Sequence, residues 1–166
     1  MPKPSSGRII RTENFSSKHV PARNVDVWLP ENYSPKNKYA VLYMQDGQML
    51  FDSAITWNKQ EWGVDELLST LMKEGKIKNC IVVGIWNGGV SRHAEYFPQK
   101  PFESLSPSQQ DSVYSAYRSG GQSIFGGKTI ISDQYLLFLT KELKPFIDRT
   151  YSTKSDRANT FLAGSS

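Results

Sequence analysis

Short hydrophobic segments with strand-like patterning recur along the chain. Positions 25–29 alternate between apolar and polar side chains and are followed by Pro30, which predicts an antiparallel strand at the edge of a sheet. Positions 39–44 and 81–85 are continuous apolar runs, as expected of strands that are buried on both faces. Positions 160–163 form a further short apolar run, and we expect a third buried strand there.

Two longer segments have the spacing of amphipathic helices. Between positions 61 and 73, apolar side chains recur every three or four residues, which predicts a helix. Ser132 and Asp133 are typical of a helix start, and the apolar face that follows them extends to Ile147. Pro145 lies inside this second pattern, so we expect it to kink the helix or to divide it.

Strands and helices therefore alternate along the chain, which predicts the α/β class. The expected architecture is a mostly parallel sheet with helices on both faces and an antiparallel N-terminal edge. With 166 residues, the chain is long enough for one domain, which we place at 1–166. The segment 98–131 breaks the alternation because it is long and rich in Ser, Gly, Gln and Pro, with a short helix predicted over 106–118. Such a segment is either a lid or binding loop, or a mobile surface insertion.

Composition narrows the functional classes. Hydrophobic residues make up 38% and charged residues 22%, as in ordinary globular proteins. The formal net charge is +4, but the basic residues are scattered among acidic ones, so we expect no nucleic-acid partner. Cys80 is the only cysteine, which excludes an internal disulfide, and its apolar surroundings predict a buried, inert thiol.

The sequence also bears on membranes and location. No apolar run is long enough to predict a membrane-spanning helix, so we expect no membrane insertion. The first residues lack the apolar core of a signal peptide, which is compatible with a cytoplasmic protein or with a processed secreted or periplasmic one.

The carboxyl ends of parallel strands are where ligands bind in open α/β sheets. The first predicted parallel strand leads into Gln45-Asp46-Gly47-Gln48, the second into Trp86-Asn87-Gly88-Gly89 and the third into Gly164-Ser165-Ser166. The third sequence matches the first half of the nucleophile elbow, Gly-x-Ser-x-Gly, in which a tight turn exposes the serine hydroxyl above the sheet. By itself, Gly-Ser-Ser is more typical of an ordinary loop or of an expression tail.

Several ordered blocks of the sequence resemble the Putative esterase family of α/β-hydrolases, which includes enterochelin-esterase-like and carbohydrate-esterase-like enzymes. The blocks are 39–52 (YAVLYMQDGQMLFD), 56–66 (TWNKQEWGVDE), 81–89 (IVVGIWNGG), 92–98 (RHAEYFP), 137–151 (LFLTKELKPFIDRTY) and 156–166 (DRANTFLAGSS). The resemblance implies an α/β-hydrolase fold of which this chain is the N-terminal part, ending at the nucleophile elbow. It also implies a Ser-His-Asp triad and no metal or organic cofactor.

The resemblance assigns roles to individual residues. Ser166 aligns with the catalytic nucleophile, and the backbone N–H of Gln48 aligns with one donor of the oxyanion hole. Trp57 and Tyr96 match positions near the substrate cleft, although stacking in the core is an equal alternative for both. In the same region, Arg92 and Glu95 are expected to hold the loop after the second parallel strand, a structural role.

The triad is incomplete in this sequence. In α/β-hydrolases the acid and the histidine follow the serine in the chain, whereas His19 and His93 both precede Ser166. We expect both to be solvated surface residues, and we expect the catalytic histidine and acid to lie beyond position 166, in a longer protein. A sheet that ended at the third parallel strand would also leave an open apolar edge.

The function expected from these features is that of a serine esterase. It would hydrolyse a small-molecule carboxylic ester, such as a sugar ester or a siderophore-like ester, through an acyl-enzyme on Ser166. The alternatives are an acyltransferase of the same fold, and a non-catalytic hydrolase-like module that binds carbohydrate or protein. Neither the natural ester nor the oligomeric state follows from the sequence.

Overall fold

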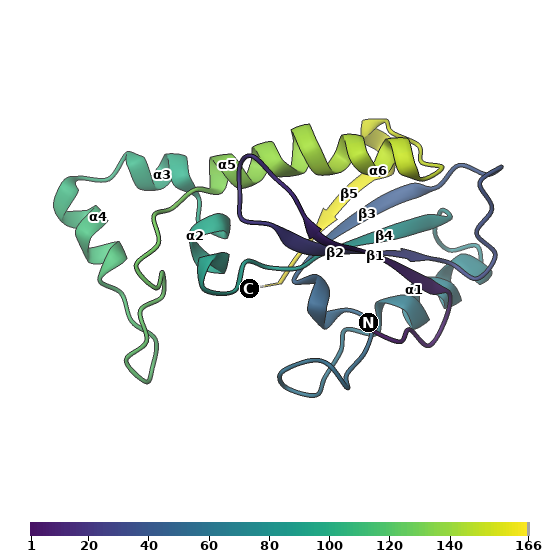
Figure 1. Cartoon of the computed structure of the whole chain (residues 1–166), viewed down its shortest axis with the longest axis horizontal. Coiled ribbons are helices and arrows are strands. Elements are labelled where there is room, and N and C mark those ends of the chain that lie inside the picture. Colours follow the sequence, from purple (N-terminus) through teal and green to yellow (C-terminus); the bar gives the residue numbers. More distant parts are fainter. Residues whose placement is uncertain (166) are drawn as a thin grey trace. The chain divides into compact units, whose positions relative to one another are not determined.

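The computed structural model describes residues 1–165, which form two compact units (Figure 1). The first, here called the sheet unit, consists of Met1–Ser16, Ala22–Asn87 and the chain from Pro145 onward. The second, here called the helical unit, consists of Ser17–Pro21 and Gly88–Lys144. Each unit is described by itself.

Within residues 1–165, the strands form one five-stranded sheet in the order β1-β2-β4-β3-β5. Their bounds are β1 (Arg8–Phe15), β2 (Arg23–Leu29), β3 (Ala40–Gln45), β4 (Cys80–Ile85) and β5 (Thr160–Ala163). β3 is parallel to both β4 and β5, whereas the β1–β2 and β2–β4 pairs are antiparallel. The sheet is therefore mixed, with a parallel part and an antiparallel N-terminal edge, as predicted.

The position of β2 differs from the expectation. The alternating segment was placed at the edge of the sheet, but β2 lies between β1 and β4, and β1 is the outermost strand on that side. The polar residue that produced the alternation, Asp26, is fully buried and bonded to the side chain of Arg11 in β1. The polar residue in the pattern is therefore a buried, paired carboxylate and does not indicate a solvent-exposed face.

At the other side of the described sheet, β5 has only β3 as its neighbour. Phe161 and Leu162 in β5 are 47% and 60% exposed. Continuous apolar residues are typical of strands that are covered on both faces. Within the described residues, however, the side chains of Phe161 and Leu162 are not covered, so β5 is not the buried strand that was expected.

Helices cover both faces of the sheet (Figure 1). The helical elements of this unit are η1 (Gly47–Met49), α1 (Val64–Lys73), η4 (Arg157–Asn159) and α6 (Lys144–Thr150), the last with all but its first residue in the unit. On one face Met44 packs with Val64 of α1. The preceding side chain, Tyr43, points to the other face, where burial and, to a smaller extent, the charge of Asp148 in α6 raise its pKa.

The helix boundaries show one difference from the expectation and one agreement with it. α1 begins at Val64 rather than at position 61, because Gly63 has a φ of 58° and caps the helix in the left-handed conformation. The predicted helix with the internal proline is divided into α5 (Ser132–Leu137), a π-helical segment (Phe138–Leu143) and α6. Pro145 follows the π-helical segment and lacks the N–H that a regular helix would require, which accounts for a break of register here.

The helical unit contains η2 (Gly89–Ser91), α2 (Arg92–Tyr96), α3 (Gln99–Glu103), α4 (Pro107–Tyr114) and α5. Its core consists of Ala94, Phe102, Phe125 and Ile130. Aromatic rings meet edge to face around Phe125, at 5.3 Å from Phe97 and 5.5 Å from Tyr114 between ring centroids. The segment 98–131 is thus a folded part of the helical unit and contributes Phe102, Phe125 and Ile130 to its core. Within this segment, a capping box between Ser106 and Gln109 starts α4.

Candidate active site

The three parallel strands end at the same edge of the sheet. Their register pairs Gln45 of β3 with Ile85 of β4, and Met44 of β3 with Ala163 of β5. The residues that follow the three strands therefore begin side by side. This carboxyl edge is the place where α/β sheets bind ligands, and the sequence places its candidate residues here.

Asp46, Gly47 and Gln48, here called the 46–48 turn, leave β3 through an unusual backbone conformation. Asp46 has a φ of 54° and a ψ of 46°, in the left-handed region that residues with a side chain rarely adopt. Its carbonyl accepts a hydrogen bond of 2.8 Å from the backbone N–H of Met49, which closes η1. The chain thereby folds back over the end of the sheet immediately after β3.

Gly47 is required by the close approach of this turn to β4. A Cβ atom at position 47 would lie 2.5 Å from the carbonyl carbon of Gly84 and 2.7 Å from the backbone nitrogen of Ile85. Both neighbours are backbone atoms of a central strand, so neither can move aside easily. The turn is therefore pressed against the carboxyl end of β4.

Asn87 ties the 46–48 turn to the chain that follows β4. The side-chain Nδ2 of Asn87 donates a hydrogen bond of 2.6 Å to Oδ1 of Asp46. The backbone N–H of Asn87 donates to Oε1 of Gln48 at 3.3 Å. The residues on both sides of Gly47 are thus bonded to one residue of the neighbouring strand end.

The residue before Asn87 is anchored in the antiparallel part of the sheet. The indole N–H of Trp86 donates to Oδ2 of Asp26 at 2.8 Å, and its backbone N–H donates to the carbonyl of Asn24 at 3.1 Å. The guanidinium carbon of Arg11 lies 4.6 Å from the centroid of the Trp86 ring, and its hydrogen bonds to Asp26 raise the pKa of Arg11. Arg11, Asp26 and Trp86 thus form a connected group across β1, β2 and the end of β4. No role was expected for any of the three from the sequence.

Gln48, for which the resemblance implies an oxyanion-donor role, lies in η1 directly after the end of β3. Its backbone N–H belongs to the first turn of η1, where a helix provides no acceptor of its own. The end of β5 also reaches this region, because a Cβ atom at Gly164 would lie 3.1 Å from the Cγ of Gln45. Ser166, the candidate nucleophile, lies outside the described residues.

Trp57 lies on the loop between η1 and α1 in the sheet unit and is 85% exposed, so the alternative that it stacks in the core is wrong. Its loop is held by Asp52, which accepts backbone hydrogen bonds from Lys3 at 2.8 Å and Ala54 at 2.9 Å. These bonds lower the pKa of the Asp52 carboxyl. The exposed indole ring of Trp57 is thus carried by a loop that hydrogen bonds hold in place.

Tyr96 belongs to the helical unit. Its ring centroid lies 5.3 Å from that of Tyr135, and the guanidinium carbon of Arg92 lies 5.1 Å from it. Glu95 is buried, with its carboxylate against Gly88, where a Cβ atom would lie 2.9 Å from Oε1. Arg92 therefore packs on Tyr96, and Glu95 packs against Gly88 at the start of the helical unit. Both contacts support the structural role expected for Arg92 and Glu95.

The two histidines were expected to be solvated surface residues; both are partly exposed, and each has a side-chain partner. His19 is half-buried, with its Nδ1 2.9 Å from Oε1 of Gln134, and Nε2 of His93 contacts the guanidinium of Arg118. All four residues belong to the helical unit. The buried thiol predicted for Cys80 is confirmed, and burial raises its pKa to about 11.

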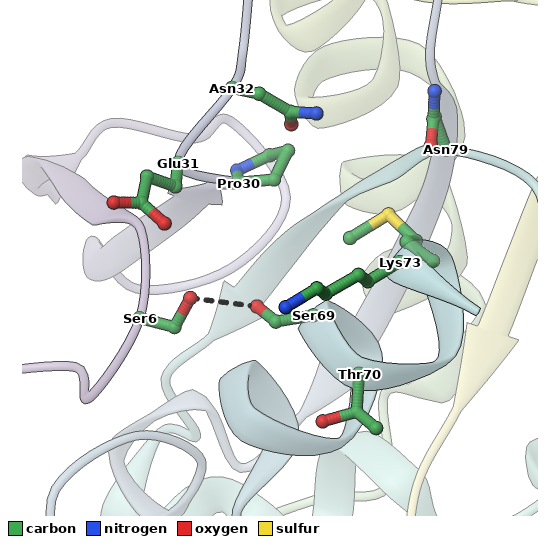
Figure 2. Close-up of a pocket in the computed structure, with 9 residues that line it drawn as sticks. Ser6, Pro30, Glu31, Asn32, Ser69, Thr70, Lys73 and Asn79 are labelled. Atoms are coloured by element: carbon green, nitrogen blue, oxygen red, sulfur yellow. Dashed lines mark hydrogen bonds between the residues drawn. The ribbon is translucent and has the colours of Figure 1, made fainter. Parts of the chain in front are cut away.

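A hollow of about 510 Å³ lies at the opposite edge of the sheet (Figure 2). It is lined by Ser6, Glu31, Ser69 and Lys73, among others, and the hydroxyls of Ser6 and Ser69 are 2.9 Å apart. Asn79, which also lines it, directly precedes β4, so the hollow is at the amino ends of the parallel strands. It is therefore separate from the carboxyl edge that carries the candidate site.

Within residues 1–165, no helix combines the length and the apolar character needed to cross a membrane. Over the same residues, no three His, Cys, Asp or Glu side chains come together as a set of metal ligands.

Comparison with solved structures shows the fold. A ferulic acid esterase from Anaeromyces mucronatus, in complex with ferulic acid, matches with a TM-score of 0.59 and 21% identity over 98% of this chain and 50% of that chain. An IroE-like serine hydrolase from Shewanella oneidensis matches with a TM-score of 0.57 and 24% identity over 88% and 40%. A mutant feruloyl esterase module from Clostridium thermocellum, complexed with sinapinate, gives 0.56 and 19% over 99% and 47%.

The chain thus spans about half the length of these solved structures, all of which are less than 25% identical to it. The fold is that of the α/β-hydrolase-like esterases, as the sequence predicted. The family model described as Putative esterase matches residues 18–166, which is most of the chain. The chain therefore belongs to the Putative esterase family.

Proposed function

We propose that this chain carries the nucleophile and one oxyanion donor of a carboxylic ester hydrolase. The observation that carries the proposal is the 46–48 turn, which is bonded to Asn87 at the carboxyl edge of the sheet. β5 ends at the same edge and leads through Gly164 toward Ser166. A rigid turn with a backbone N–H beside the end of the nucleophile strand is the arrangement that acyl transfer needs.

The proposed chemistry begins with attack of the Ser166 hydroxyl oxygen on the ester carbonyl carbon. The hydroxyl proton passes to a histidine that we expect beyond position 166, and the carbonyl oxygen becomes an oxyanion. The backbone N–H of Gln48 donates to this oxyanion, a contribution of about 3 kcal/mol to the stability of the transition state. The histidine then protonates the departing alcohol, and water hydrolyses the acyl-enzyme to release the acid.

The proposed substrate is a small-molecule ester that contains an aromatic ring or a sugar. The exposed ring of Trp57 supports this class, because indole faces stack on both kinds of surface. Two of the matching solved structures have ferulic acid or sinapinate bound, which supports an aromatic acyl group.

The test is labelling with a fluorophosphonate probe, followed by peptide mass mapping, in the full-length protein that carries this chain. We expect the label on Ser166 and none in a Ser166→Ala variant. Ser165→Ala is the matched control, because the neighbouring serine should not be needed for labelling. Release of free acid from a feruloyl ester distinguishes hydrolysis from acyl transfer. Labelling that is absent, or that stays in the Ser166→Ala variant, would contradict the proposal.

A further inference from the structure

We propose that Asn87 is a positioning residue that holds the 46–48 turn in the conformation needed to bind an oxyanion. This inference rests on the proposed function, because it concerns the same site. It adds a residue to which neither the motif nor the resemblance assigned a role. Asn87 acts through Asp46 and Gln48 and does not itself contact the reacting atoms.

The turn has an uncommon backbone conformation, which aspartate tolerates better than most residues but which still needs contacts to hold it. Asp46 is in the left-handed region, where the Cβ atom of an ordinary residue approaches its own backbone too closely. Such conformations persist when surrounding contacts determine them, and they are concentrated at functional sites. The contact of Gly47 with β4 limits the turn from one side, but it bonds neither Asp46 nor Gln48.

Asn87 bonds both Asp46 and Gln48 from the other side. Its Nδ2 and the carboxylate of Asp46 are 2.6 Å apart, which is short and charge-assisted. Asp46 is itself buried, so this bond is little exposed to competition from water. The carbonyl of the same Asp46 accepts the hydrogen bond that closes η1, so fixing Asp46 also fixes the first turn, where the Gln48 N–H lies.

Asn87 can serve as a fixed point because its own position is set by the sheet. Trp86, immediately before it, is bonded through both its indole and its backbone N–H to β2. Asp26, the acceptor of the indole, is fully buried and also bonded to Arg11. The 46–48 turn is thus connected through Asn87 to the most buried part of the sheet.

The test compares Asn87→Ala with a swapped pair, Asp46→Asn combined with Asn87→Asp, in the full-length protein. The swap keeps the charge and the two atoms of the bond but reverses the direction of donation. Asn79→Ala is the matched control, since Asn79 stands at the opposite end of the same strand. Melting temperature and circular dichroism verify that each variant is folded.

The first measurement is amide hydrogen exchange at Met49, whose N–H bonds to Asp46. We expect Asn87→Ala to speed this exchange by about tenfold or more, the swapped pair to restore slow exchange, and Asn79→Ala to change nothing. The second is steady-state kinetics on a feruloyl ester. We expect Asn87→Ala to lower kcat by about 10- to 100-fold with little change in KM, because an oxyanion donor acts in the transition state.

The outcomes separate this inference from the proposed function. Unchanged exchange at Met49 in Asn87→Ala would overturn the positioning role, whether or not the protein is an esterase. Faster exchange with unchanged kcat in an active enzyme would also overturn it. Faster exchange, rescued by the swap, in a protein that neither hydrolyses esters nor labels at Ser166 would support the positioning of the turn but refute the proposed function.

Discussion

The guanidinium of Arg11 bonds both carboxylate oxygens of Asp26, with 2.7 Å between Nε and Oδ1 and 2.8 Å between Nη2 and Oδ2. This pair joins the outermost strand β1 to β2, and the side chain of Asp26 is fully buried. We predict that Arg11→Met lowers the free energy of unfolding by about 3–5 kcal/mol, because it leaves a buried charge without its cation. Urea denaturation followed by tryptophan fluorescence measures the change.

The surface pair Lys76–Glu74 is the control for this prediction. Its Nζ–Oε2 distance is also 2.8 Å, but its side chains are 66% and 47% exposed. We expect Lys76→Met to change stability by less than about 1 kcal/mol, because exposed ion pairs contribute little. Equal losses in the two variants would show that the burial of Asp26 does not matter.

Gly47→Ala should disturb the candidate site. The added methyl group would meet backbone atoms of β4 at 2.5–2.7 Å, so the 46–48 turn has to move. We predict a loss of about 1–3 kcal/mol in the free energy of unfolding and faster hydrogen exchange at Met49. The comparison is Gly75→Ala, where φ is 69° but no atom lies within 4 Å, so only the backbone cost of about 1–2 kcal/mol applies. Slow exchange at Met49 in Gly47→Ala would contradict the close approach.

Cys80 should be unreactive in the folded protein. Burial raises its pKa to about 11, so at pH 8 roughly one thiol in a thousand would be ionised, and the side chain is covered as well. We predict no reaction with Ellman's reagent at pH 8 over the time in which the urea-unfolded protein reacts completely. Rapid reaction of the folded protein would mean that the start of β4 opens readily.

Asp156 should titrate below the ordinary range of an aspartate. Two hydrogen bonds from the Nδ2 of Asn159, at 3.0 and 2.8 Å, favour the charged form and lower its pKa. A lowered pKa in the folded state stabilises the fold above the unfolded-state pKa, and this contribution is lost as pH falls through the folded-state pKa. In an NMR titration, Asn159→Ala should raise the pKa of Asp156. An unchanged pKa would assign the shift to other neighbours.

Trp57 should contribute to substrate binding and not to stability. Because its ring is 85% exposed, Trp57→Ala is expected to change the free energy of unfolding by less than about 0.5 kcal/mol. On a feruloyl ester we expect a higher KM with little change in kcat. Trp28→Ala is the contrasting variant, since Trp28 is fully buried and its loss should cost about 3–5 kcal/mol. An unchanged KM in Trp57→Ala would remove Trp57 from the site.

The parallel strands could be predicted because their signal is local. Residues 39–44 and 81–85 are apolar throughout, as strands buried on both faces must be, and they correspond to β3 and β4. The placement of Gly47 and Gln48 at a strand end followed from the same reasoning. The strand β1 was missed, because its sequence RIIRTENF carries charged residues without a regular apolar face.

The sequence by itself determined the class of the fold, the order of its elements and the strand ends at which chemistry is expected, because hydrophobic periodicity states which side of each element is buried. Only the tertiary structure decided which distant side chains meet. Asn87 and Asp46 are 41 residues apart, and Asp26 and Trp86 are 60 apart. Each of these bonds depends on the lateral order of the strands, which no local pattern encodes, so the group that holds the 46–48 turn became visible only in the folded chain.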